Sequence, residues 1–286
     1  MNRREFIQTT SFAALGASLT SFAFIDKKKI GLQLYSLRDM IPQDPKGVLK
    51  KVADFGYKEL EAYSYSDGKI FGMKYKEFSD YVKGLGMKVT SGHHLLGKSE
   101  NTRMMKGTVM NEWERAVNDA KESGQDFMVV AFLMPDERKD YKGVCEALNK
   151  AGELCKKYGV RLNYHNHEFE FEQFEGQVAY HVMLKELDPK LVGMEMDLYW
   201  MHVANQSPAE YFEKYPGRFE QWHVKDMDKT NPKQQVDVGT GRIDFKSIFA
   251  KAKQSGLKHF YIEQEAYPVS SIDSVEKCIG NLRRMI

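Results

Sequence analysis

The sequence predicts one (β/α)8 barrel, also called a TIM barrel, as a single domain preceded by a separate N-terminal segment. After Lys27, short apolar runs alternate with longer segments whose apolar residues recur three and four positions apart. Strands that alternate with helices favour a parallel sheet built from right-handed strand–helix–strand units. Eight such units follow one another, and a closed barrel of this kind needs about 250 residues of the 286 available.

The predicted strands are short apolar runs, several of which come directly after a turn that contains glycine. The helical stripe in residues 48–55, for example, is followed by Gly56, and a glycine just beyond such a stripe is a common helix stop. An open doubly wound sheet is the alternative, but no GxGxxG follows the first strand. In chain order the predicted strands are residues 30–36, 58–63, 88–92, 127–132, 161–165, 191–197, 219–224 and 259–263.

Composition argues against two classes of protein. The 42 basic and 40 acidic residues leave a net charge of +2, whereas a nucleic-acid-binding protein usually has a basic excess, so no nucleic-acid partner is expected. The three cysteines, Cys145, Cys155 and Cys278, are odd in number and lack CxxC spacing. They therefore predict buried thiols rather than disulfides or a thiolate metal site.

Residues 1–25 have the three-part plan of an export signal, and the barrel is predicted over residues 28–286. Arg3 and Arg4 precede an uncharged segment, residues 9–24, that is rich in small and apolar side chains. This resembles a twin-arginine signal and implies a periplasmic or otherwise exported protein. The apolar run is short and diluted for a membrane span, so no stable membrane insertion is expected.

Polar residues gather at the predicted ends of the strands, where barrels of this class carry their active sites. Five of the eight histidines lie there, together with several carboxylates. Imidazole and carboxylate donors from separate strands suit a divalent transition metal, whereas one such residue alone is more often a helix cap or a rim residue. The residues that carry this interpretation are His93, His94, His165, His167, His223, Asp197 and Glu263.

Several motifs then resemble the sugar phosphate isomerase/epimerase proteins of the xylose isomerase-like barrel superfamily. The most specific are YHNHEFEF at 164–171, DLYW at 197–200, HVKDM at 223–227 and GTGRIDF at 239–245, with GLQLYSLR at 31–38 as the opening. The resemblance spans nearly all of residues 28–286. It implies a barrel enzyme that uses one divalent metal ion, Mn, Co, Mg, Fe or Zn, on a small sugar or keto-sugar.

The resemblance also implies a ligand set from four strand ends. Relatives place a Glu after strand five, an Asp after strand six, a His after strand seven and a Glu after strand eight. This sequence departs at the first position, where His165 stands in place of the Glu. Glu168, Glu170 or Glu265 are alternatives for one of the ligands. The implied metal ligands are His165, Asp197, His223 and Glu263.

The same resemblance implies proton transfer next to a carbonyl, with an enediolate stabilised by the metal. The candidate acids and bases are His167, Lys225 and Glu168, although Lys225 could instead pair with Asp226. The loop at 239–245 is expected to cover the substrate, and Arg242 in it could instead form a salt bridge at a helix start. The candidate substrate-binding residues are His93, His94, Trp200 and Arg242.

Four functions stay open from the sequence. The first is a metal-dependent isomerase or epimerase, expected to act on a non-phosphorylated sugar because few basic residues cluster at the strand ends. The second is a lyase that eliminates a substituent from 3-keto-glycosides. The third is a carbohydrate-binding barrel without activity, and the fourth is a nuclease of the endonuclease IV branch, which the charge disfavours. A homo-oligomer is compatible with every one of them.

Overall fold

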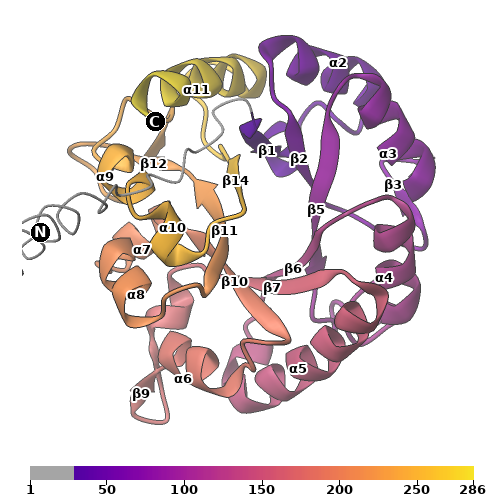
Figure 1. Ribbon diagram of the computed structural model, residues 1–286, viewed down its shortest axis with the longest axis vertical. Helices are drawn as coiled ribbons and strands as arrows, with labels where there is room; N and C mark the ends of the chain where they lie inside the picture. Colours follow the sequence, from indigo (N-terminus) through magenta and orange to yellow (C-terminus); the bar gives the residue numbers. More distant parts are fainter. Residues whose placement is uncertain (1–28) are drawn as a thin grey trace, which may run out of the picture.

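The computed structural model describes residues 29–286 as a closed barrel of eight parallel strands (Figure 1). The strands pair in chain order, and the last pairs back with the first, which closes the sheet. This confirms the predicted fold. The barrel strands are β1 Gly31–Gln33, β2 Glu59–Ala62, β5 Lys88–Leu95, β6 Phe127–Phe132, β7 Arg161–His165, β10 Val192–Asp197, β11 Phe219–Val224 and β14 His259–Ile262.

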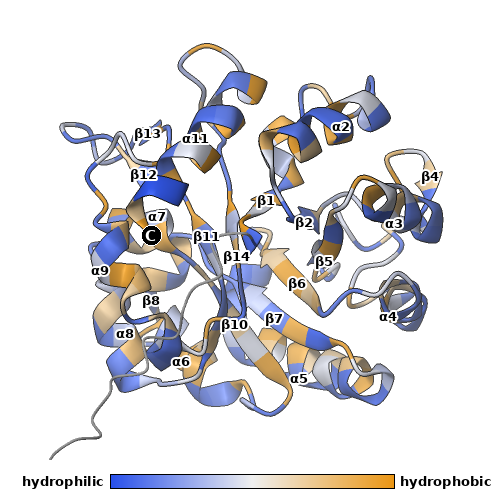
Figure 2. Cartoon of the chain, turned by 45° about the horizontal axis from the view of Figure 1, so that its top comes forward, coloured by the Kyte–Doolittle hydropathy of each residue, from blue (hydrophilic) through white to orange (hydrophobic). Residues whose placement is uncertain are grey.

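Helices form a ring around the barrel, and Figure 2 shows hydrophobic and hydrophilic residues side by side along them. Three short hairpins, β3–β4, β8–β9 and β12–β13, extend from the loops. Their strands are Lys69–Ile70, Met73–Lys74, Gln173–Phe174, Gln177–Val178, Asp226–Met227 and Gln235–Val236. The helices are α2 Pro45–Phe55, α3 Tyr75–Gly84, α4 Trp113–Glu122, α5 Tyr141–Tyr158, α6 Ala179–Glu186, α7 Leu198–Val203, α8 Pro208–Lys214, α9 Phe245–Phe249, α10 Ala252–Ser255 and α11 Ser271–Met285, and the 3-10 turns are η2 Leu34–Leu37, η3 Glu137–Lys139 and η4 Phe169–Phe171.

The local sequence explains where these helices begin and end. In α2 the side chain of Asp44 accepts from the backbone N–H of Gly47, and Pro45 occupies the first turn, where its missing N–H costs nothing. Gly56 ends the helix with a φ of 94°, a left-handed conformation that favours glycine. The buried side chains of α2 are those of the predicted stripe, Val48, Leu49 and Val52.

The interior of the barrel is lined by hydrogen-bonded polar side chains. Asn163 donates to Gln221 at 2.7 Å, Gln221 donates to Ser91 at 2.9 Å, and Ser91 donates to Glu61 at 2.6 Å. All four are fully buried and come from four different strands. Since buried polar groups are costly unless paired, this network specifies how the strands face one another. The network lies inside the barrel, below the side chains at the C-terminal ends of the strands.

The first strand is shorter than predicted. Residues 30–36 are expected to be extended, but β1 ends at Gln33, whose side chain accepts from the N–H of Tyr35 and starts the turn η2. Conversely, β5 continues to Leu95, beyond the predicted end at residue 92. Within residues 29–286, no helix is long and apolar enough to cross a membrane. The predicted export signal at 1–25 lies outside the described residues.

Candidate metal centre

Four side chains converge at the C-terminal end of the barrel, and we call them the outer group. Each offers one donor atom, these atoms all lie within 4.8 Å of one another, and all four residues are buried. Parallel pairing contributes to this convergence, because it sets Asp197 on β10 beside His223 on β11 along the sheet. The outer group consists of His165, Asp197, His223 and Glu263, the four residues predicted as ligands.

The distances within the outer group are short. Nε2 of His165 lies 3.3 Å from Oδ2 of Asp197, and Nδ1 of His223 lies 2.7 Å from Oε2 of Glu263. Asp197 also begins helix α7, where its Oδ1 accepts from the N–H of Tyr199 at 2.9 Å. Helix capping thus holds one carboxylate oxygen and leaves the other, Oδ2, facing the histidines.

Lys225 lies beside the outer group, and its ammonium group is protonated there. Its Nζ is 3.0 Å from Asp197, 2.6 Å from Glu263 and 2.8 Å from Glu265. Burial opposes the charged form, but these carboxylates outweigh it and hold the pKa of Lys225 well above its usual value. In turn Lys225 and the histidines keep the pKa of Asp197 below its ordinary range, against the effect of burial. Asp197 is therefore an anion, as a metal ligand must be.

The two donor imidazoles differ in protonation. Burial lowers the pKa of His165 to about 4, so its ring is neutral and has a lone pair to give. Burial also acts against charge on His223, but Glu195, Glu263 and Glu61 raise its pKa well above normal. A metal ion that binds Nδ1 of His223 would therefore displace the proton on that nitrogen.

A second cluster, which we call the inner group, lies deeper in the barrel and is absent from the sequence prediction. Its donor atoms also lie within 4.8 Å of one another, and it shares His223 with the outer group. Glu195 precedes Asp197 by two positions on β10, so both side chains face the barrel interior, with Glu195 deeper. The inner group consists of Glu61, His93, Glu195 and His223.

Strand alternation could have pointed to part of the inner group. Glu195 follows from the same period of two that placed Asp197 inward. Glu61 is harder to foresee, because it lies in a run of four buried residues on β2, and a register shift occurs between Leu60 and Glu61. His93 is predicted to bind substrate, whereas its Nε2 lies 3.0 Å from Glu61 and 3.1 Å from Glu195.

His167 and Trp200 line the space beside the outer group. The ring of His167 lies 4.8 Å from that of His165 and 5.6 Å from that of Trp200, between centroids. Burial, then His165 and Lys225, lower the pKa of His167 well below its usual value, so the ring is neutral. Its Nδ1 is buried without a hydrogen-bond partner among residues 29–286. The indole of Trp200 is also 5.6 Å from Nζ of Lys225.

Three other predicted residues lie away from both groups. His94 lies on the face of β5 opposite to His93, where its Nδ1 contacts the carbonyl of Gly107 at 2.9 Å and its ring packs on Trp113. Glu168 and Arg242 are exposed. The structure brings none of the three into the metal centre. Among the alternative ligands, Glu170 is buried but accepts instead from the N–H of His167 at 2.8 Å.

The alternative pairing of Lys225 with Asp226 is wrong. Asp226 points to the loop predicted to cover the substrate and accepts from the backbone N–H groups of Gly239, Gly241 and Ile243, at 2.9, 2.9 and 3.2 Å. Successive residues of an extended segment point to opposite sides, which separates Lys225 from its neighbour. The exposed Arg242 therefore belongs to a loop that Asp226 fastens to the barrel.

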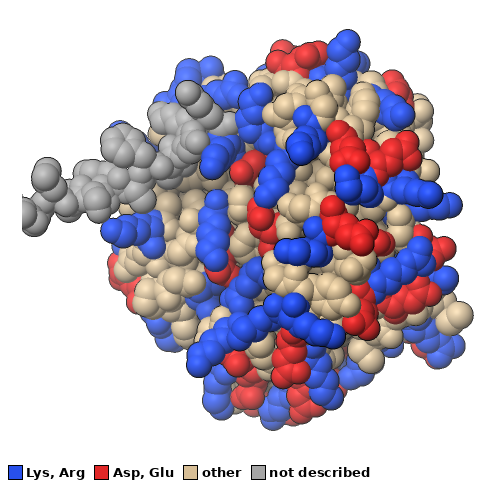
Figure 3. All heavy atoms as spheres, turned by 45° about the vertical axis from the view of Figure 1, so that its right-hand side comes forward, with Lys and Arg blue, Asp and Glu red and all other residues tan. Residues whose placement is uncertain are grey.

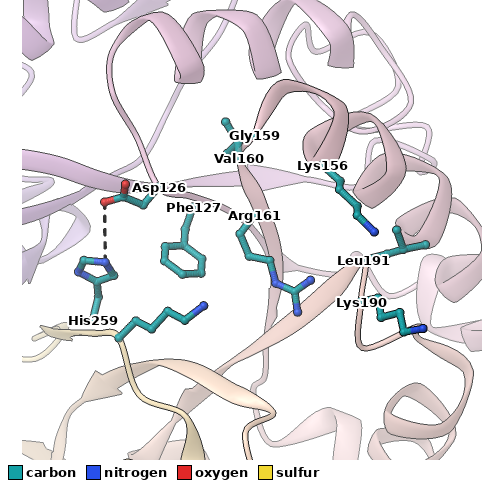
Figure 4. Close-up of a pocket in the computed structure, with 10 residues that line it drawn as sticks. Asp126, Phe127, Lys156, Gly159, Val160, Arg161, Lys190, Leu191 and His259 are labelled. Atoms are coloured by element: carbon teal, nitrogen blue, oxygen red, sulfur yellow. Dashed lines mark ion pairs between the residues drawn. The ribbon is translucent and has the colours of Figure 1, made fainter.

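Pockets lie at both ends of the barrel. One of about 550 Å³, shown in Figure 4, is lined by residues at the N-terminal ends of the strands, among them Phe127, Arg161 and His259. That end of such barrels serves stability rather than catalysis. Another of about 520 Å³ includes Tyr63 and Phe71, just after β2, at the end that carries the metal centre.

On the face in Figure 3, basic and acidic side chains are interspersed, without a basic track.

The donor set fits a divalent cation. The outer group offers two imidazole nitrogens and two carboxylate oxygens, a mixture that zinc, manganese, iron and cobalt accept. Its carboxylates would be costly to bury without positive charge nearby. The three cysteines are buried, and burial raises the pKa of each thiol to about 12, so thiolate ligands are not on offer. The residues that would hold the ion are those of the outer group.

Fold and site together define a metal-binding barrel of the class that places its chemistry at the C-terminal ends of parallel strands. Residues 49–284 match the family described as xylose isomerase-like TIM barrel. The chain belongs to this family, which confirms the family resemblance read from its motifs.

Relatives differ in the reactions that their names give. The chain is 25% identical, over 254 residues, to an inosose dehydratase of Clostridium perfringens (strain ATCC 13124), covering 79% of this chain and 76% of that one. Matches to other inosose dehydratases span less, as little as 42% of the relative in Clostridium tetani. A sugar phosphate isomerase/epimerase structure from Parabacteroides distasonis is 29% identical with a TM-score of 0.75, covering 91% of this chain and 95% of that one. The IolI protein, solved with a zinc atom, shares the fold at 14% identity and a TM-score of 0.68, over 90% of this chain and 97% of that one.

Proposed function

We propose that this protein is a metal-dependent lyase acting on an uncharged keto-sugar or a related cyclic ketone. It removes a proton from the carbon next to the ketone and expels the oxygen substituent of the following carbon. The observation that carries the proposal is the meeting of the outer group with a neutral histidine, His167, and a buried ammonium, Lys225. The names of the inosose dehydratases, whose reaction is a loss of water, support it.

The metal ligands, His167 and Lys225 have different roles in this reaction. A divalent ion held by the outer group would supply a Lewis acid for the negative charge that develops on the ketone oxygen. His167, neutral because of its burial, accepts the proton from carbon as the C–H bond breaks. The electron pair forms the new C=C bond as the C–O bond to the leaving group breaks. Lys225, or a water molecule next to it, returns a proton to that oxygen.

A substrate without phosphate suits the charges around the centre. Lys225 is already paired with three carboxylates, and Arg242, the one cation predicted to bind substrate, is exposed on its loop. A phosphate group usually needs arginine or lysine side chains or helix N-termini to bind it. Trp200 and Tyr63 instead offer apolar ring faces of the kind on which a sugar packs.

An isomerase or epimerase is the second candidate, because the Parabacteroides distasonis structures at 27% and 29% identity carry that name. It shares with the lyase the removal of a proton from carbon and differs in the second step. In an isomerase or epimerase the proton returns to carbon, and no carbon–oxygen bond breaks. The mass of the product therefore separates the two reactions.

The test is incubation of the metal-loaded protein with 3-keto-glycosides, cyclic keto-polyols and simple ketoses, followed by mass spectrometry. The lyase releases an alcohol or water and leaves an unsaturated ketone. His167→Asn should lower turnover by about 10²- to 10⁴-fold, as loss of a general base does, without changing the bound metal. The matched control is His181→Asn, on α6 outside the barrel, where Nε2 contacts Tyr211 at 2.8 Å.

Other outcomes would replace the proposal. A product of unchanged mass in every reaction would identify an isomerase or epimerase. Binding of a sugar that survives Asp197→Ala and His223→Ala, without turnover on any substrate, would identify a carbohydrate-binding barrel.

A further inference from the structure

We propose that the inner group binds a second divalent cation, of the zinc type, so that the barrel holds two ions joined through His223 as an imidazolate, whose two ring nitrogens both release their protons to solvent when the ions bind. This inference rests on the inner group's own residues and does not depend on the proposed reaction. Every residue of the group is buried except His93, whose side chain is 14% exposed. Two are imidazoles and two are carboxylates, which is a complete set for a four-coordinate ion.

The spacing of the inner donors suits a tetrahedral ion. Nε2 of His223 lies 2.5 Å from Oε2 of Glu61 and 3.3 Å from Oε2 of Glu195. Nε2 of His93 lies 3.0 and 3.1 Å from the same two oxygens. A tetrahedral zinc ion with ligands at about 2.0–2.2 Å places neighbouring donors roughly 3.3–3.6 Å apart. The pairs at 3.0–3.3 Å need to open by only a few tenths of an ångström to enclose an ion, and the pair of His223 and Glu61, at 2.5 Å, by about 0.8 Å.

Hydrogen bonding accounts poorly for this arrangement. Each of the two imidazole nitrogens lies between the same pair of carboxylate oxygens, and a single N–H points well at only one acceptor. A cation at the centre would satisfy all four atoms at once. In addition, Oε1 of Glu195 is buried without a hydrogen-bond partner within residues 29–286. This oxygen is not one of the four donor atoms, but a buried carboxylate that lacks hydrogen bonds needs positive charge nearby, which a bound cation would supply.

His223 connects the two groups because it presents one ring nitrogen to each. Nδ1 faces Glu263 of the outer group, and Nε2 faces Glu61 of the inner group. Gln33 and Ser91 donate to the two oxygens of Glu61 at 2.8 and 2.6 Å, so two buried side chains already hold this carboxylate in place. The inner group uses four protein donors and leaves no position open, which is the property of a structural site.

The experiment measures bound metal rather than activity. The full chain is loaded with Zn²⁺, freed of excess metal by gel filtration and analysed by inductively coupled plasma mass spectrometry. The wild type should retain about two zinc ions per chain, and Glu61→Gln and His93→Gln about one. Glu59→Gln is the matched control on the same strand, where the carboxylate pairs with His259 at 2.6 Å, and it should retain two.

A second measurement covers variants that fail to fold. Anomalous diffraction at the zinc edge from wild-type crystals should show one peak between Glu61 and His93 and another in the outer group. One zinc per chain in the wild type, with a single peak at the outer group, would overturn the second site and leave the proposed reaction intact. A single peak at the inner group would overturn the two-ion arrangement and also remove the metal from the proposed reaction.

Discussion

At the scale of single residues, the metal centre depends on which atoms of each side chain are already engaged. Asp197 commits one oxygen to the start of α7 and keeps the other for the histidines. His167 owes its position to Glu170, which accepts from its backbone N–H. His165 and His167 are two positions apart and both reach the centre, although only His165 belongs to the outer group.

Glu170 should make stability depend on pH. Its burial raises the pKa to about 7, against the lowering effect of the hydrogen bonds from Tyr164 and His167. The folded state therefore holds this proton more tightly than the unfolded chain, and the stabilisation present below about pH 4.5 is lost as the pH rises through 7. At about 1.4 kcal/mol per pKa unit, the free energy of unfolding should fall by on the order of 3 kcal/mol over this window.

Glu170→Gln tests this because the amide resembles the protonated acid and cannot ionise. Urea unfolding between pH 5 and 8 should show a smaller decline in the variant than in the wild type. Glu172→Gln, an exposed glutamate two residues further on, serves as the control and should keep the wild-type slope. An equal slope in Glu170→Gln would contradict the assignment.

At the scale of elements, the loop after β13 has its largest group of side-chain hydrogen bonds at Asp226. Asp226 fastens residues 239–243 through three backbone N–H groups, and close approach explains the glycine at 241. A Cβ there would lie 2.2 Å from the carbonyl oxygen of Met227 and 2.3 Å from the carboxylate of Asp226. This buried contact, rather than the loop's own sequence, determines where Arg242 is presented.

Asp226→Ala should therefore free the loop. Several buried backbone donors lose their acceptor, which we expect to lower the free energy of unfolding by about 3 kcal/mol. Limited proteolysis should cut within residues 228–243 faster than in the wild type. Asp228→Ala removes a more exposed carboxylate of the same segment, which accepts from Thr230 and Asn231, and should cost less than about 1 kcal/mol. Equal proteolysis of both variants would show that Asp226 does not hold the loop.

At the scale of the whole molecule, the barrel concentrates charge where its strands end. Carboxylates and histidines from β2, β5, β7, β10, β11 and the end of β14 meet in one interior, and Lys225 balances part of their charge. Ions held there would join strands that are far apart in sequence. Because such ions bind the folded chain, they stabilise the barrel as a unit.

Metal removal should therefore lower the melting temperature. A metal present at about 100 times its dissociation constant stabilises the fold by about 2.7 kcal/mol, which for a chain of this size corresponds to a shift on the order of 5–10 °C. Differential scanning calorimetry before and after EDTA treatment measures it, and added Zn²⁺ should restore the original value. Asp197→Asn should respond less to EDTA. An unchanged melting temperature in protein shown to have lost its metal would refute this expectation.

Local sequence predicted the barrel, and the family resemblance implied the four residues of the outer group, which the structure brings together. Apolar periodicity and glycine stops act within a few residues, and the period of two on a strand assigns inward-facing side chains without reference to the rest of the chain. The reaction that we propose is an elimination, whereas the sequence motifs favoured isomerisation or epimerisation.

Only the tertiary structure decided which charges meet. The inner group joins Glu61 to His223 across 162 residues, and the position of Glu61 depends on a register shift in the pairing of β2 with β5. The same holds for Lys225, whose partners lie on other strands and not beside it in sequence. Contacts across a closed barrel are set by how the strands pair, and pairing is a property of the whole sheet rather than of any local pattern.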